Sequence, residues 1–162
     1  MNTEIIINVL LILGLANGAP ILAARIFGDW FATPIDRGRV ASDGFPWLGS
    51  SKTWRGILAA CLLALPIALW LDFRLSEAFM MIGLSMLGDL SSSFIKRRRG
   101  MVSSSRAIGL DQIPEAALPV IYLWAMEHLS AVEGLVIVLL FIVVEVIVSK
   151  MLFHLHIRKR PY

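Results

Sequence analysis

The sequence is poor in cysteine and in charge. Its 162 residues include one cysteine, Cys61, so neither an intramolecular disulfide nor a metal site built from several cysteines can form. Charged residues make up 17% of the chain, whereas a soluble domain carries about 25%. Hydrophobic residues make up 57% and the mean hydropathy is +0.76. These values exclude a soluble globular domain and indicate an integral membrane protein.

The apolar residues are gathered into five runs, and a membrane-spanning helix needs about 20 such residues. The runs cover about 5–27, 56–71, 78–95, 116–129 and 135–155, with long loops at 28–55 and 96–115. We therefore expect an all-α, polytopic protein with five transmembrane helices and one membrane-embedded domain over 1–162. Within the first run, 17–20 read Asn-Gly-Ala-Pro, which predicts a break in that helix.

Basic residues are concentrated on one side of this arrangement. With five spans, both long loops and the C-terminus share a side, and all of the 15 lysines and arginines except Arg74 lie at that side. The positive-inside rule makes it the cytoplasm. We expect an N-terminus outside, a cytoplasmic C-terminus, and a polar face that meets cytoplasmic nucleotides at the cell membrane.

The third run carries polar residues on one helical face. At about 100° per residue, Asp89, Ser93 and Lys96 fall within about 40° of one another, and Arg98 points almost oppositely. A carboxylate at mid-bilayer costs roughly 2.5–3.5 kcal/mol, so Asp89 should face protein or a water-filled cavity. An anion, a hydroxyl and a cation on one face suit a metal-phosphate site. The alternatives are that Asp89 only pairs with Lys96, and that Arg98 anchors to anionic headgroups.

The first long loop ends with small residues, a Lys-Thr pair and Arg55, just before the second run. Backbone N–H groups at a helix N-terminus attract anions, and neighbouring basic side chains strengthen the attraction. The segment is not a Walker A loop, because its glycine spacing is absent. A phosphate cradle and an interfacial loop with Trp54 in the aromatic belt both fit this pattern.

Asp36, Asp89 and Asp111 all fall at the predicted cytoplasmic end. Mg²⁺ binds a few carboxylate oxygens together with substrate phosphates, so three such aspartates could converge on one ion. Taken singly, a loop aspartate is equally a cap or turn residue. Asn17 fits a packing kink as well as a substrate contact. Glu145 shares a face with Ser149 and His156, and for it we favour a structural pairing.

Several motifs, in order along nearly the whole chain, resemble the CDP-archaeol synthase family, which is related more distantly to CDP-diacylglycerol synthases. The matching segments are 17–20, Pro34-Ile35-Asp36, 51–56, Leu87-Gly88-Asp89, 93–98 and Leu110-Asp111-Gln112. The resemblance implies a Mg²⁺-dependent cytidylyltransferase of phospholipid biosynthesis. It would join CTP to 2,3-bis-O-(geranylgeranyl)-sn-glycerol 1-phosphate, or to a related phosphatidic-acid-like lipid, and release pyrophosphate.

The resemblance also implies roles for individual residues. Asp89 and Asp111 would bind Mg²⁺, with Asp36 a weaker candidate, and Lys52 and Lys96 would join the two aspartates as catalytic residues. The substrate contacts would be Ser51, Lys52, Thr53, Arg55, Ser93, Lys96, Arg97 and Asn17. The chain departs from the family pattern at Arg37, at Ser50 and at Pro114-Glu115, where relatives carry a second acid one residue earlier. These departures leave the number of metal ions and the role of Glu115 open.

Two other functions remain as alternatives. A CTP-dependent polyprenol or lipid kinase would transfer the γ-phosphate instead of CMP. A non-enzymatic transport or scaffold subunit would need an acidic path across the membrane, but the acids of the candidate site cluster at one end and Glu145 is the only deep acid. We expect no nucleic-acid partner, and the frame leaves both a monomer and a homodimer open.

Overall fold

The computed structural model describes residues 1–103, 105, 107 and 109–155. In these residues the chain forms five helices: α1 Thr3–Phe27, α2 Trp54–Trp70, α3 Leu75–Arg98, α4 Gln112–Ala125 and α5 Ala131–His154. Among the described residues, strand pairing is limited to two isolated bridges, so the all-α prediction is confirmed. Helices α1, α3 and α5 are long and apolar enough to cross a membrane, and α2 is shorter. The predicted His156, the basic residues at 158–160 and Arg106 lie outside the described residues.

Some helix boundaries differ from the sequence prediction. Helix α3 continues to Arg98, so the cluster predicted to open the second loop is helical. Helix α4 begins four residues before the expected start at 116 because Pro114 sits in its first turn, where no backbone N–H is needed. It ends at Ala125, and Glu127 soon after adopts a φ of 60°. Helix α5 begins at Ala131 because the Ser130 hydroxyl caps it.

Helix α1 is continuous, so the predicted break at 17–20 is wrong. Pro20 cannot donate a backbone hydrogen bond, but close packing supports the helix at this point. A Cβ added to Gly56 of α2 would lie 3.2 Å from the Pro20 Cβ. Asn17 Nδ2 donates to the Leu13 carbonyl and to Ser85 Oγ of α3, each at 2.9 Å. Neighbouring helices thus hold the proline-containing turn in helical form.

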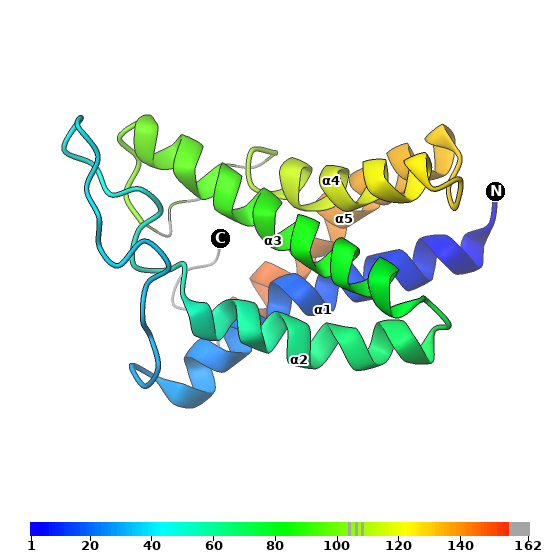
Figure 1. Ribbon diagram of the computed structural model, residues 1–162, viewed down its shortest axis with the longest axis horizontal. Coiled ribbons are helices and arrows are strands. Elements are labelled where there is room, and N and C mark those ends of the chain that lie inside the picture. The colour runs from blue at the N-terminus through cyan, green and yellow to red at the C-terminus, as the bar shows by residue number, and fades with distance from the viewer. Residues whose placement is uncertain (104, 106, 108, 156–162) are drawn as a thin grey trace.

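The helices form one bundle whose two ends differ (Figure 1). Helix α1 packs against α2, α3 and α5, α3 also packs against α2 and α4, and α4 packs against α5. Both long loops gather at one end, while the N-terminus and the two short connections lie at the other. The interior contains apolar residues of all five helices, including Leu13, Ala64, Met81, Leu123 and Phe141. The bundle therefore presents its long loops together, as one polar end.

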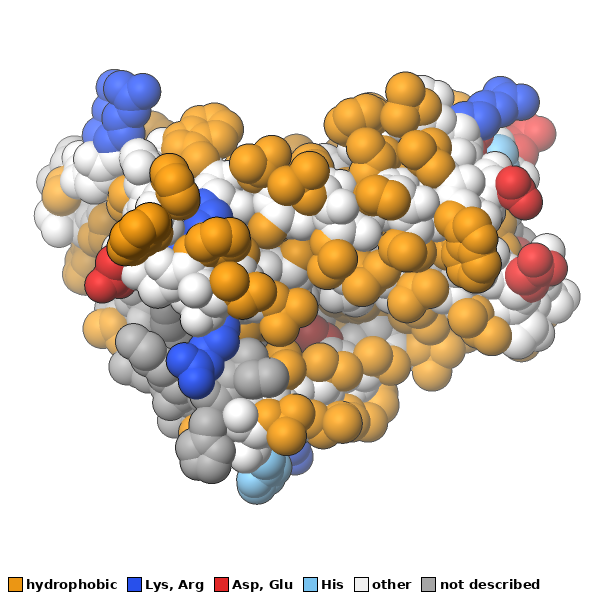
Figure 2. All heavy atoms as spheres, turned by 90° about the horizontal axis from the view of Figure 1, so that it is seen from below, with side chains coloured by type: hydrophobic (Ala, Val, Ile, Leu, Met, Phe, Trp, Pro, Cys, Tyr) orange, Lys and Arg blue, Asp and Glu red, His pale blue; other side chains and the backbone are white. Residues whose placement is uncertain are grey.

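The surface follows the same division. Figure 2 shows hydrophobic side chains over the middle of the face it presents, with basic and acidic side chains toward the two ends. Large apolar side chains are exposed on the outer faces of the helices, among them Leu62 on α2 and Leu139 on α5. An apolar band between polar ends is the surface that a bilayer requires.

Candidate active site

The first long loop is organised around Asp36. One carboxylate oxygen accepts the backbone N–H groups of Leu48 and Gly49, at 2.8 and 3.0 Å, and the other accepts that of Gly38 at 3.0 Å. Burial alone would raise the pKa of Asp36, but these N–H groups stabilise the carboxylate and the pKa falls below its ordinary value. Asp36 thereby folds the loop that leads to Lys52.

Lys52 reaches from the loop to Asp89 of α3. Its ammonium donates to both carboxylate oxygens, at 2.5 and 2.6 Å. The backbone of Lys52 is fixed because its carbonyl accepts the Ile35 N–H and because Thr53 caps α2 through the Gly56 N–H. Burial would lower the pKa of Lys52, but the attraction and hydrogen bonds of Asp89 outweigh it and raise the pKa above its ordinary value. Lys52 is therefore a cation at neutral pH.

A second ion pair connects α3 to the other long loop. Lys96 Nζ lies 2.6 Å from Asp111 Oδ1 and donates to the Ser105 carbonyl at 2.9 Å. Asp111 Oδ2 accepts the Ala107 N–H at 3.0 Å, which fixes the carboxylate just before α4. The Lys96 side chain is 8% exposed. Two lysine–aspartate pairs thus stand on α3, one turned to each loop.

Helices α3 and α4 approach each other at Gly88. A Cβ at this position would lie 2.3 Å from the Pro114 carbonyl oxygen and 2.6 Å from the Glu115 nitrogen, closer than real atoms come. Only glycine permits this crossing. The crossing puts the buried Glu115 beside Asp89, and Glu115 interacts electrostatically with Asp89, Lys52 and Glu145. Glu115, whose role the sequence left open, therefore lies beside Asp89.

Arg97 adds a buried cation to this end of the bundle. The residue is 2% exposed and interacts electrostatically with Asp111. Its Nε has no hydrogen-bond partner among the described residues. Ser51 Oγ and Ser103 Oγ lie 3.2 Å apart and join the two loops, and Ser93 is buried on α3. A buried donor without a partner suits an anionic ligand.

The helical-face prediction separates Lys96 from Arg98 correctly. Arg98 turns to the first loop, where it pairs with Asp43 at 2.7 Å and donates to the Phe45 and Pro46 carbonyls. Its guanidinium also lies 5.2 Å from the centre of the Phe94 ring. The sequence analysis did not identify Asp43 as the partner of Arg98. The only sign of this pair in the sequence is that both residues fall on the predicted cytoplasmic side. Arg98 therefore holds the loop rather than the Asp89 cluster.

Other predicted residues lie apart from the two pairs or have partners of their own. Arg55 Nη1 donates to the Gly28 and Trp30 carbonyls, where it holds the end of α1. Asn17 bonds within the bundle, as described above. Among the described residues, no three His, Cys, Asp or Glu side chains gather closely enough to hold a metal ion. The three aspartates thus do not form one ready ligand set.

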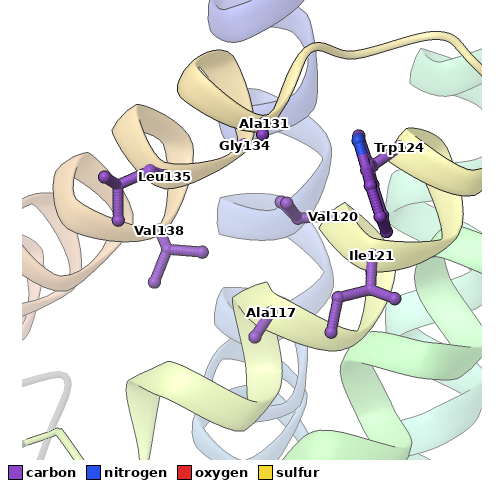
Figure 3. A pocket seen from close by; sticks show the side chains of 8 residues that line it. All are labelled: Ala117, Val120, Ile121, Trp124, Ala131, Gly134, Leu135 and Val138. Atoms are coloured by element: carbon purple, nitrogen blue, oxygen red, sulfur yellow. The ribbon is translucent and has the colours of Figure 1, made fainter.

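An apolar groove of about 220 Å³ lies between α4 and α5 (Figure 3). On α4 it runs from Ala117 to Trp124, and on α5 from Ala131 to Val138. Its lining residues carry no charge. The groove begins two residues after Glu115, about 200° round α4 from it, and leads toward the short-connection end of the bundle.

Comparison with known proteins agrees with the resemblance seen in the sequence. The model of the CarS-like family, described as CDP-archaeol synthase, matches residues 2–162. The chain is 32% identical to the CDP-archaeol synthase of Thermococcus kodakarensis over 138 residues, 78% of this chain and 76% of the relative. It is 33% identical to that of Sulfurisphaera tokodaii over 138 residues, 80% and 82% of the two chains.

A solved structure described as an intramembrane enzyme for archaeal membrane lipids biosynthesis has the same fold. It aligns with a TM-score of 0.71 at 20% identity, covering 86% of this chain and 91% of that one. Together with the long apolar helices, this fold makes the chain a multi-pass membrane protein. Since the family match spans nearly the whole chain, the protein belongs to the CDP-archaeol synthase family of cytidylyltransferases.

Proposed function

We propose that this protein transfers CMP from CTP to a membrane lipid phosphate, forming a CDP-lipid and pyrophosphate for phospholipid biosynthesis. The lipid is 2,3-bis-O-(geranylgeranyl)-sn-glycerol 1-phosphate or a related phosphatidic-acid-like lipid. Family membership supports the reaction. The structural observation that carries the proposal is the pair of lysine–aspartate contacts, Lys52–Asp89 and Lys96–Asp111, on one helix end. They put lysine ammoniums, which can bind phosphate, beside carboxylates, which can bind a metal ion.

The residues present fit a Mg²⁺ cofactor. This ion uses one or two carboxylates together with phosphate oxygens and water, so it needs no cage of protein ligands. Asp89 and Asp111 supply such carboxylates. Asp36 is the weakest candidate because both of its oxygens already accept backbone N–H groups. When bound, Mg²⁺ neutralises the phosphates and helps to orient them for transfer.

Basic side chains would bind the phosphates of CTP and of the lipid. Lys52, Lys96 and the buried Arg97 lie at the same helix end and can exchange carboxylate partners for phosphate oxygens. The hydroxyls of Ser51, Thr53 and Ser93 would add hydrogen bonds. Arg55 and Asn17 are weaker substrate contacts because each already donates to a backbone carbonyl. These groups would position two anions that repel each other in water.

The reaction needs no protein nucleophile. An oxygen of the lipid phosphate attacks the α-phosphorus of CTP, the bond from that phosphorus to the bridging β-phosphate oxygen breaks, and pyrophosphate leaves. Catalysis then consists of positioning and charge stabilisation by Lys52, Lys96 and Arg97. The lysine ammoniums would stabilise the negative charge that develops on the leaving pyrophosphate.

We place the site at the cytoplasmic surface of the cell membrane, with five spans and the N-terminus outside. The apolar band of the bundle and the basic loop end support this orientation. Helix α4, with 14 residues, is roughly 21 Å long and shorter than a bilayer core. A lipid chain would lie in the groove between α4 and α5, which starts two residues beyond Glu115. Its phosphate would then lie toward the loop end of the bundle, which carries Asp89.

Labelled nucleotide tests the reaction directly. Purified protein in lipid vesicles receives Mg²⁺, the lipid phosphate and CTP labelled at either the α- or the γ-phosphate. We expect the α-label to enter the lipid and the γ-label to leave as pyrophosphate. Transfer of the γ-label alone would make the protein a CTP-dependent lipid kinase and overturn the proposal.

A further inference from the structure

Asp89 lies between a cation and a second acid. Lys52 donates to both of its oxygens, and the buried Glu115, 5% exposed, interacts electrostatically with the same carboxyl across the α3–α4 crossing. Glu145 of α5 interacts electrostatically with Glu115. Lys52 is also attracted by Glu115 and Asp111. Its ammonium therefore faces acidic side chains from more than one helix.

The acidic side of this contact is rigid. Asp89 and Glu115 stand on packed helices whose backbones meet at Gly88, so the backbone positions of the two residues are fixed relative to each other. Two buried acids this close are stabilised by a proton or by a positive charge beside them, because adjacent carboxylates repel and have lost much of their hydration. In the structure that positive charge is the Lys52 ammonium.

The basic side of the contact can move. Lys52 belongs to a loop, and its side chain is a flexible four-carbon stem that ends in a point charge. The side chain keeps 21% of its surface exposed, so part of it reaches the surface of the protein although its charge is desolvated. It can therefore turn from Asp89 to a phosphate while Asp89 and Glu115 stay in place.

We propose that Glu115 is a further cation-binding residue of this site, and that Lys52 occupies the place of a divalent cation on the Asp89–Glu115 pair until nucleotide phosphates draw its ammonium away. This inference rests on the proposed function, since it needs a nucleotide at the site. Metal alone competes with Lys52, and nucleotide alone competes with Asp89 for the same lysine. The two ligands therefore assist each other's binding.

Binding of Mn²⁺ in the absence of nucleotide tests the competition. Paramagnetic resonance of free Mn²⁺ is followed while the purified protein is titrated in detergent. Lys52→Met removes the ammonium and should bind Mn²⁺ about tenfold or more tightly than the unaltered protein. Lys150→Met, the same change at an exposed position of α5, should leave Mn²⁺ binding unchanged. Equal affinities in all three proteins would overturn the inference.

The role of Glu115 is tested in the Lys52→Met background, where no lysine competes. In this background, Glu115→Gln keeps the shape of the side chain and should weaken Mn²⁺ binding about tenfold. Glu115→Asp keeps the charge and should weaken Mn²⁺ binding less. Unchanged affinity in the Glu115→Gln variant would exclude Glu115 as a ligand. Loss of Mn²⁺ affinity in Glu115→Gln with partial recovery in Glu115→Asp supports a direct ligand, because collapse of the fold would affect both.

The labelling experiment separates this inference from the proposed function. If α-label enters the lipid but Lys52→Met binds Mn²⁺ no more tightly, the exchange of cations is wrong and the cytidylyl transfer stands. If Mn²⁺ binding follows the expected pattern but no α-label is transferred, the cation site stands and the proposed reaction is wrong.

Discussion

The two ends of the bundle use the same residue types in different ways. At the short-connection end, acidic side chains cap helices: Glu77 accepts the Arg74 N–H, and Glu133 accepts those of Asn2 and Ser130. At the loop end, Asp89 forms an ion pair with Lys52, and Asp111 forms one with Lys96. Glu77 and Glu133 thus hold helix ends, whereas Asp89 and Asp111 hold lysine cations that can change partners.

This difference separates folding from chemistry. A backbone N–H cannot leave its carboxylate unless the helix end unfolds, whereas a lysine can leave when a better anion arrives. Buried ion pairs also contribute little net stability, because desolvation offsets much of their attraction. The loop end therefore holds groups that can change partners, while the opposite end holds the helices in register.

The largest expected effect comes from Asp89→Asn. The amide keeps the shape but cannot pair with Lys52 or bind a divalent cation as a carboxylate does, so transfer of α-label should fall by about a thousandfold or more. Asp43→Asn is the matched control, because Asp43 also pairs with a basic residue at this end but outside the Asp89 cluster. Near-normal activity of Asp89→Asn in membranes that contain the inserted protein would remove Asp89 from the site.

Gly88→Ala should follow, although it removes no functional group. The added methyl would overlap the Pro114 carbonyl, so α4 must move away from α3 and carry Asp111 and Glu115 with it. A displacement of about 1 Å can cost about 100-fold in rate. Gly83→Ala is the control on the same helix, since nothing lies within 4 Å of its added Cβ. Equal initial rates for the two variants would disprove the role of the crossing.

Comparing kcat/KM of Lys96→Ala with that of Arg98→Ala tests whether the two faces at the end of α3 have different roles. Loss of the Lys96 ammonium removes a charged hydrogen bond to substrate, worth about 1.5–3 kcal/mol, so kcat/KM should fall roughly 10- to 100-fold. Arg98→Ala loosens the first loop, and an ion pair that is partly exposed contributes about 1 kcal/mol or less. Its kcat/KM should change less than about fivefold. Equal losses would contradict the separation of the two faces.

Sequence patterns predicted the bundle well because hydrophobic runs and helix periodicity are local properties. They also predicted that Asp89 and Lys96 face one side of α3 and that Arg98 faces another. They did not predict which lysine pairs with which aspartate, because Lys52 and Lys96 each pair with an aspartate that is distant in sequence. The closeness of Glu115 and Asp89 depends on the α3–α4 crossing at Gly88, and a single helical glycine beside an aspartate was the only local sign of it.

Asn17 and Asp36 show a second limit of the sequence. Both residue types occur in substrate sites and in structural caps, so their positions alone could not separate the two roles. The structure engages Asn17 with Ser85 and Asp36 with loop backbone. A role in substrate or metal binding for either would require them to leave these partners.

Glu77→Gln should have the smallest effect and tests the other end of the comparison. Glu77 Oε2 accepts the Arg74 N–H at 3.0 Å as part of a capping box, and the amide preserves size but weakens this bond. We expect a loss of stability of about 1 kcal/mol, or about 2–4 °C in Tm, with kcat and KM within twofold. Glu127→Gln, at an exposed position between α4 and α5, is the control and should change neither stability nor rate. A large loss of kcat in Glu77→Gln at unchanged Tm would show that acids at this end also serve the reaction. The separation of folding from chemistry between the two ends would then be wrong.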